Sequence, residues 1–166
     1  VELNVIRARR EVARMDENVE SVFLYWADLF QRPDKTLRAR SKEMTARIEL
    51  VARMREEISA YLVECSREPM GEQLATTVNE LVRIVHRLDS VADTSGKLIR
   101  ITGEWEASKR TLSNKLVQSV EPYIALVREF LAFNKSHLDS HLDADQLQQA
   151  FDMEQKINDM QKNLKK

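Results

Sequence analysis

Residues 74–101 read LATTVNELVRIVHRLDSVADTSGKLIRI, and this stretch decides the fold. Its apolar side chains recur at alternating steps of four and three residues. That is the period of a helix packed lengthwise against other helices. The stripe consists of Leu74, Val78, Leu81, Val85, Leu88 and Ala92, with Ile99 further on. The stretch therefore predicts one long helix, from about 70 to 101, with one buried face.

The composition of the whole chain is that of long amphipathic helices. Of its 166 residues, 43% are hydrophobic and 32% are charged, whereas glycine and proline occur only three times each. So few glycines and prolines leave little turn chemistry for a sheet, and no segment shows sustained alternation of apolar and polar residues. We therefore expect an all-α protein, long enough to form one domain with a continuous core.

Further helical stripes are separated by a small number of turn residues. The first helix has Val12, Met15, Val19, Val22, Trp26 and Leu29 on one face, and the stripe of the second is interrupted by Arg55, with Met54 beside it. Pro33 and Pro69 break the pattern, Gly103 is expected to end the third helix, and Ser108 is a candidate cap for the next. Pro122 lies inside the fourth stripe and is expected to kink it. The other predicted helices cover about 3–30, 34–64, 109–137 and 143–164, the last with Asp143 as its cap.

Short breaks make consecutive helices antiparallel neighbours, so the prediction is an up-down bundle of about five long helices. We expect a single domain over residues 1–166. A weak internal similarity divides it into a three-helix repeat at about 1–103 and a partial second repeat at about 108–166. The helical pattern is already under way at the first residue, which indicates a piece of a longer protein.

Charge and motif content argue against several function classes. The net charge is −1 and charges of both signs are interspersed, so we expect no nucleic-acid binding; the run Arg7, Arg9, Arg10 is read as solvated helix surface. Cys65 is the only cysteine, which suits a reducing compartment. No nucleophile–base pair or glycine-rich phosphate loop is visible, so we expect no enzyme.

An acidic pair on the third helix is the main candidate site. Asp89 and Asp93 lie one turn apart on one face, and His86 precedes them on the same face. Carboxylates with an imidazole suit iron, manganese or zinc, and carboxylates alone suit magnesium or calcium. We expect a divalent or ferric ion at Asp89 and Asp93, with His86 as a further ligand. The donors expected from the first helix are Asp16, Glu17 and Glu20.

The alternative interpretation of this face is a solvated acidic surface without metal. It takes Arg83, Arg87 and Lys97 as ion-pair partners on the same helix, of which Lys97 lies four residues after Asp93. Two ligands from one helix do not make a tight metal site. Both interpretations therefore stay open at the level of the sequence.

The segment Leu88-Asp89-Ser90-Val91-Ala92-Asp93 resembles the signature of PhoU-family domains. In that family an acidic residue and an Asp, separated by three residues, lie on the third helix of each of two three-helix repeats. Asp89 and Asp93 take these positions, and Ala92 matches a small residue of the pattern. The family often has Asn four residues after the Asp, whereas this chain has Lys97, a cation that would compete with a metal.

The resemblance implies a regulatory or interaction role in phosphate uptake. PhoU-like domains occur as free phosphate-signalling proteins and as cytoplasmic tails of sodium/phosphate cotransporter-like membrane proteins. We expect this chain to be such a tail, on the cytoplasmic side of the cell membrane. Its expected partner is the transporter portion of the same or another chain, and a homodimer is also expected. The alternatives are a metal-independent helical scaffold or oligomerisation module and a free-standing phosphate-signalling regulator.

Overall fold

The structure is a computed structural model, and it describes residues 2–31, 39–108, 113–138 and 144–164. Within these ranges it holds five helices and no strand, which confirms the all-α prediction. None of these helices is both long and apolar enough to cross a membrane. The helices are α1 (Glu2–Gln31), α3 (Ser41–Cys65), α4 (Glu72–Ala107), α5 (Asn114–His137) and α6 (Ala144–Leu164).

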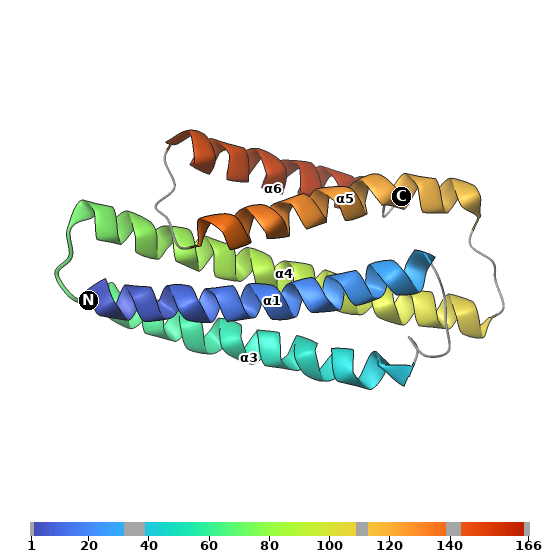
Figure 1. Ribbon diagram of the computed structural model, residues 1–166, viewed down its shortest axis with the longest axis horizontal. Coiled ribbons are helices and arrows are strands. Elements are labelled where there is room, and N and C mark those ends of the chain that lie inside the picture. Colours follow the sequence, from blue (N-terminus) through green and yellow to red (C-terminus); the bar gives the residue numbers. More distant parts are fainter. Residues whose placement is uncertain (1, 32–38, 109–112, 139–143, 165–166) are drawn as a thin grey trace. The chain divides into compact units, whose positions relative to one another are not determined.

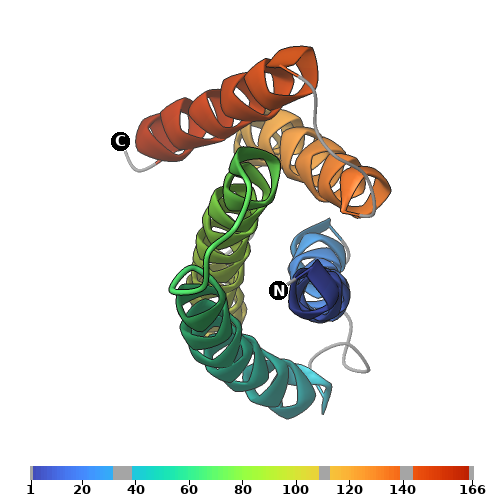
Figure 2. The ribbon, with the colours of Figure 1, turned by 90° about the vertical axis from the view of Figure 1, so that its left-hand side faces the viewer.

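The chain divides into two compact units, Val1–Glu104 and Trp105–Lys166. The first unit holds α1, α3 and nearly all of α4; the second holds the α5–α6 pair. In the first unit α3 runs antiparallel to α1 and α4 (Figure 1). Seen from the end, α1 lies on the concave side of the arc that α3 and α4 form (Figure 2).

The predicted stripes form the core of the first unit. The stripe of α4 is buried from Val78 to Ala92, and Leu74 at its start is half-buried. The predicted stripe of α1 is buried throughout: Val12, Met15, Val19, Val22, Trp26 and Leu29. On α3, where Arg55 interrupts the stripe, the neighbouring Met54 is buried in its place. The helical period therefore identified these buried faces correctly.

The aromatic end of α1 ties this helix to α4. The Trp26 ring contacts Phe23 and Phe30, with ring centroids 5.7 and 5.5 Å apart. Its indole Nε1 donates a hydrogen bond to Thr102 Oγ1 on α4, at 3.2 Å. A buried indole N–H needs such an acceptor, because leaving it unpaired costs roughly 1–3 kcal/mol. Nearby, a cluster of Val22, Tyr25, Leu29 and Met44 joins α1 to α3.

At Gly96, α4 approaches a side chain of α3 closely. A Cβ atom placed on Gly96 would lie 3.0 Å from Ile48 Cδ1, whereas Gly103, seven residues later on the same helix, has no neighbouring atom within 4 Å. Glycine in a helix interior costs about 1 kcal/mol relative to alanine. At Gly96 that cost is offset by the close approach of the two helices.

Two expected helix ends differ from the structure. Gly103 does not end the third helix, because α4 continues to Ala107. The serine that caps α5 is Ser113 and not Ser108: its side chain accepts a hydrogen bond from the Leu116 amide at 3.2 Å. Pro122 lies inside α5 without ending it. Because proline has no N–H, the backbone carbonyl of Gln118, four residues earlier, receives no helical hydrogen bond from residue 122. Both residues are exposed, so water can donate to this carbonyl instead.

The second unit is an antiparallel hairpin of α5 and α6 (Figure 1). Buried side chains of both helices, such as Phe130 and Ile157, form its apolar side. Gln161 donates a hydrogen bond to the Tyr123 hydroxyl at 3.2 Å, and burial raises the pKa of that phenol above its ordinary value. The predicted breaks and caps at Pro33 and Asp143 lie outside the described residues.

The two glycines of α4 provide a matched test of this packing. We expect Gly96→Val to lower the free energy of unfolding by about 1–3 kcal/mol, because the added carbons meet Ile48. Gly103→Val changes the same residue type on the same helix in open space, and we expect a neutral or slightly stabilising effect. Denaturant unfolding of both variants measures the difference, and equal effects would contradict the close α3–α4 contact.

Candidate functional site

The expected acidic pair lies on α4, but a residue of α3 contacts it. Asp89 Oδ2 lies 3.1 Å from Arg55 Nε, and the two side chains are 31% and 33% exposed. The contact is an ion pair by distance and not a directional hydrogen bond, because Arg55 Nε has no acceptor in hydrogen-bonding geometry. Arg55 therefore supplies a positive charge at the place where the sequence predicts a metal ion.

The protonation of Asp89 reflects this half-buried position. Desolvation raises the pKa of its carboxyl above the ordinary value of 3.8, and the Arg55 guanidinium opposes that rise. Repulsion from Asp93 adds to the increase in pKa. Asp89 therefore makes its whole contribution to the free energy of unfolding at pH values below its ordinary pKa. That contribution is lost as the pH rises through the higher pKa that Asp89 has in the folded protein.

Asp93 has a partner on its own helix. Its Oδ2 lies 2.9 Å from Lys97 Nζ, one turn later, and the two side chains are 64% and 67% exposed. This is the same-helix pairing that the solvated-surface interpretation expects for Asp93. An exposed pair of this kind contributes little to stability. It nevertheless means that a metal ion at Asp93 would have to displace the ammonium group.

The remaining expected ligands are spread over the first unit. His86 and Glu17 are exposed, Glu20 is half-buried, and Asp16 is fully buried in α1. Among the described residues, no group of three or more His, Cys, Asp or Glu side chains is arranged to hold a metal. The metal site therefore stays a prediction; the structure supplies two carboxylates, each beside a cation.

Arg55 is the site residue that sequence reasoning missed. Its position on an apolar stripe was visible, and a charged residue there requires a partner of opposite charge. The identity of that partner depends on how α3 and α4 are staggered. Arg55 lies 3.7 Å from Glu56, its neighbour in the sequence, but its contact with Asp89 depends on the arrangement of the two helices, which the helical period does not predict.

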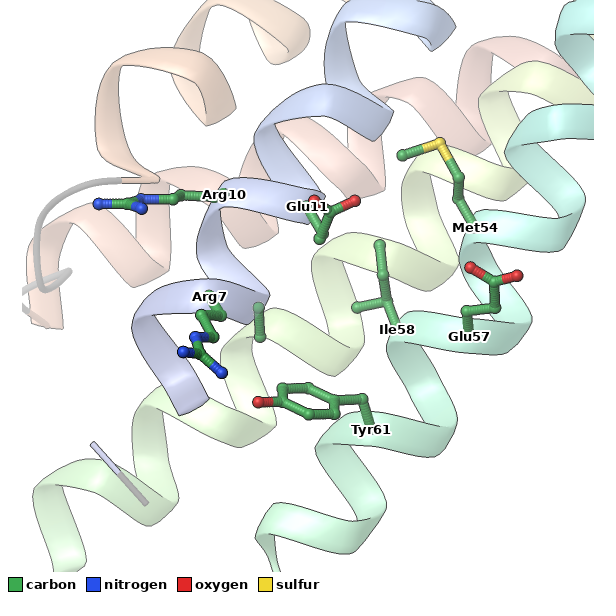
Figure 3. A pocket seen from close by; sticks show the side chains of 8 residues that line it. Arg7, Arg10, Glu11, Met54, Glu57, Ile58 and Tyr61 are labelled. Atoms are coloured by element: carbon green, nitrogen blue, oxygen red, sulfur yellow. The ribbon is translucent and has the colours of Figure 1, made fainter. Parts of the chain in front are cut away.

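A second candidate site is a groove between α1 and α3, with a volume of about 550 Å³. Ala8 and Ile58 are buried at its floor, and Met54 closes one side. Figure 3 shows Tyr61 of α3 with its hydroxyl directed toward Arg7 of α1. The other residues that line the groove are Arg10, Glu11 and Glu57.

A smaller hollow of about 330 Å³ lies between α5 and α6. It is lined almost entirely by polar side chains, among them Glu129, Asp145 and Lys156. Some of these polar groups already bond to one another, since Gln148 donates a hydrogen bond to Asp152 at 3.0 Å. We interpret this hollow as solvated polar surface between α5 and α6 and not as a binding site.

No protein-family model, curated protein or solved structure matches the chain. The two candidate sites are therefore argued from their geometry.

We expect Arg55→Gln to raise the pKa of Asp89 further, because the guanidinium is the largest factor that opposes desolvation. Carbon-detected NMR titration of the Asp89 carboxyl measures this pKa directly. Arg53→Gln is the matched control, since Arg53 lies two residues away on the exposed side of α3. An Asp89 pKa that is unchanged or lower in Arg55→Gln would contradict the ion pair.

Proposed function

We propose that this chain is a PhoU-like regulatory and interaction domain linked to phosphate transport. In this proposal it is the cytoplasmic part of a sodium/phosphate cotransporter-like membrane protein, held at the inner face of the cell membrane. It acts by contact of its helix faces with the transporter portion or with a second copy, and it catalyses no reaction.

The observation that carries the proposal is the position of the acidic pair. Asp89 and Asp93 lie on the third helix of a three-helix unit, in the motif that resembles the PhoU signature. A helical hairpin follows as a separate compact unit, and the division at Glu104 falls between the two repeats proposed from the sequence. Helix order, motif position and this division are mutually consistent with the resemblance.

The ion pairs of the acidic residues suggest how a metal could regulate such a domain. A cation that binds Asp89 must compete with Arg55, which belongs to α3. Binding would release the guanidinium and so alter the contact between α3 and α4. In this proposal metal occupancy is thereby coupled to the packing of the first unit, and through it to the surface that a partner contacts.

Fractionation of the cells that produce the protein tests the proposed location. With an antibody to this domain, we expect an immunoblot band in the membrane fraction, larger than the 19.3 kDa of this chain. Phosphate uptake should also change in cells that carry Asp89→Asn/Asp93→Asn. Glu49→Gln/Glu64→Gln removes the same charge from exposed positions of α3 and is the control. A soluble band near 19.3 kDa would contradict the transporter-tail proposal.

The second candidate function is a metal-independent scaffold or oligomerisation module. Exposed apolar side chains are the observation in its favour: Leu3 and Ile6 lie three residues apart on one face of α1, where contact with a second copy could cover them. The exposed large apolar side chains of the described residues are Leu3, Ile6, Leu50, Val63, Trp105 and Phe151.

Elemental analysis and light scattering distinguish the two functions. After incubation with manganese, iron, zinc or magnesium and desalting, the metal-regulated domain should retain metal, and Asp89→Asn/Asp93→Asn should retain none. Arg55→Gln should bind more metal than the native chain, because the competing cation is gone. The scaffold predicts a dimer whose mass is unaffected by a chelator, with no bound metal in any variant.

A further inference from the structure

Two arginines of α1 differ from most arginines of the first unit in having no ion-pair partner among the described residues. Arg7 and Arg10 lie three residues apart and both line the α1–α3 groove. Neither makes a hydrogen bond or ion pair with any described residue. Glu11, which follows Arg10 in the sequence, is engaged instead by Arg14, with both carboxylate oxygens 3.2 Å from its Nη1. The Arg7 guanidinium is therefore available to an anion at the end of the groove where the Tyr61 hydroxyl lies, whereas the Arg10 side chain extends away from the apolar floor (Figure 3).

The groove itself combines this charge with an apolar floor. Ala8 is 1% and Ile58 5% exposed, and the flexible Met54 side chain lies beyond them. In Figure 3, Arg7 and the Tyr61 hydroxyl lie at one end of the groove, whereas Glu57 lies at the other. A volume of about 550 Å³ lies within the 300–1,000 Å³ that is usual for small-molecule sites.

We propose that this groove binds a single-chain anionic amphiphile, a molecule with one carboxylate or phosphate head and an alkyl tail. Arg7 binds the head, with the Tyr61 hydroxyl as an additional donor, and Arg10, three residues later on α1, adds positive charge near that end. The tail covers Ala8, Ile58 and Met54. Glu57 at the far end disfavours a second negative charge there, so the site selects ligands that are charged at one end only. The proposal does not depend on a role in phosphate transport.

The probes are decyl phosphate and decanoate, kept below the concentration at which they form micelles. Isothermal titration calorimetry should give one site per chain, with affinity that rises up to about fourfold for each added methylene group that becomes buried. Decyltrimethylammonium has the same tail and the opposite charge, and it should bind at least tenfold more weakly. Equal binding of the cationic probe would overturn the proposal, because the arginines would then play no part.

Two double variants of equal net charge locate the site. Arg7→Gln/Arg10→Gln should weaken decyl phosphate binding at least tenfold. Arg53→Gln/Arg67→Gln removes two exposed arginines outside the groove and should change the affinity less than twofold. All four positions are exposed helix or turn residues, so both variants should fold. Equal weakening in the two variants would show a diffuse charge effect and overturn the site.

Two further probes distinguish a dissolved amphiphile from inorganic phosphate and from a membrane surface. Inorganic phosphate should bind at least tenfold more weakly than decyl phosphate, because it lacks the tail. Vesicles of phosphatidylglycerol should not compete with decyl phosphate for the groove, since the proposal commits to a single chain from solution. Equal affinity for inorganic phosphate, or binding to vesicles without binding of the monomeric probes, would overturn it.

Discussion

The first unit depends on the burial of Trp26. Among the described residues the indole is the largest fully buried side chain, and its N–H must find an acceptor because water cannot reach it. Thr102 provides that acceptor only if α4 remains helical as far as this residue and lies beside the end of α1. The same requirement favours a helix that reaches Thr102, one residue before Gly103. Stopping the helix at residue 101 would remove the turn that carries the threonine hydroxyl.

The position of α4 in turn determines the neighbours of the acidic pair. With α4 parallel to α1 and α3 antiparallel to both, Gly96 faces Ile48 and, two turns earlier, Asp89 faces Arg55. The two contacts are consistent, because a step of seven residues along α4 corresponds to a step of seven in the opposite direction along α3. One close apolar contact thus fixes the stagger that pairs the carboxylate with the guanidinium. Any metal at Asp89 would act on this same α3–α4 contact.

The helical period predicted the buried faces well because it is a local property. Each residue of the α1 stripe from Val12 to Leu29 is buried, as is the α4 stripe from Val78 to Ala92. Helix ends were less well predicted: Ser108 and Ser113 are both serines before an apolar run, and local sequence does not distinguish them. The lysine partner of Asp93 was visible one turn away, whereas the Arg55 partner of Asp89 was not, because interhelical stagger is absent from the pattern. The PhoU-like resemblance itself stays a prediction.

The two candidate sites differ in whether their charged side chains already have ion-pair partners. Several acidic side chains of the first unit have arginine partners on their own helix; Glu43, for example, has a lowered pKa because Arg40 and Arg47 donate hydrogen bonds to it. At Asp89 the cation comes from another helix, so any cationic ligand meets a competitor that is already in place. The groove arginines make no ion pair with a described residue, and the groove offers apolar surface beside Arg7, although Glu11 and Glu57 also line it. On electrostatic grounds, the groove is therefore better prepared to bind an anion than the acidic pair is to bind a cation.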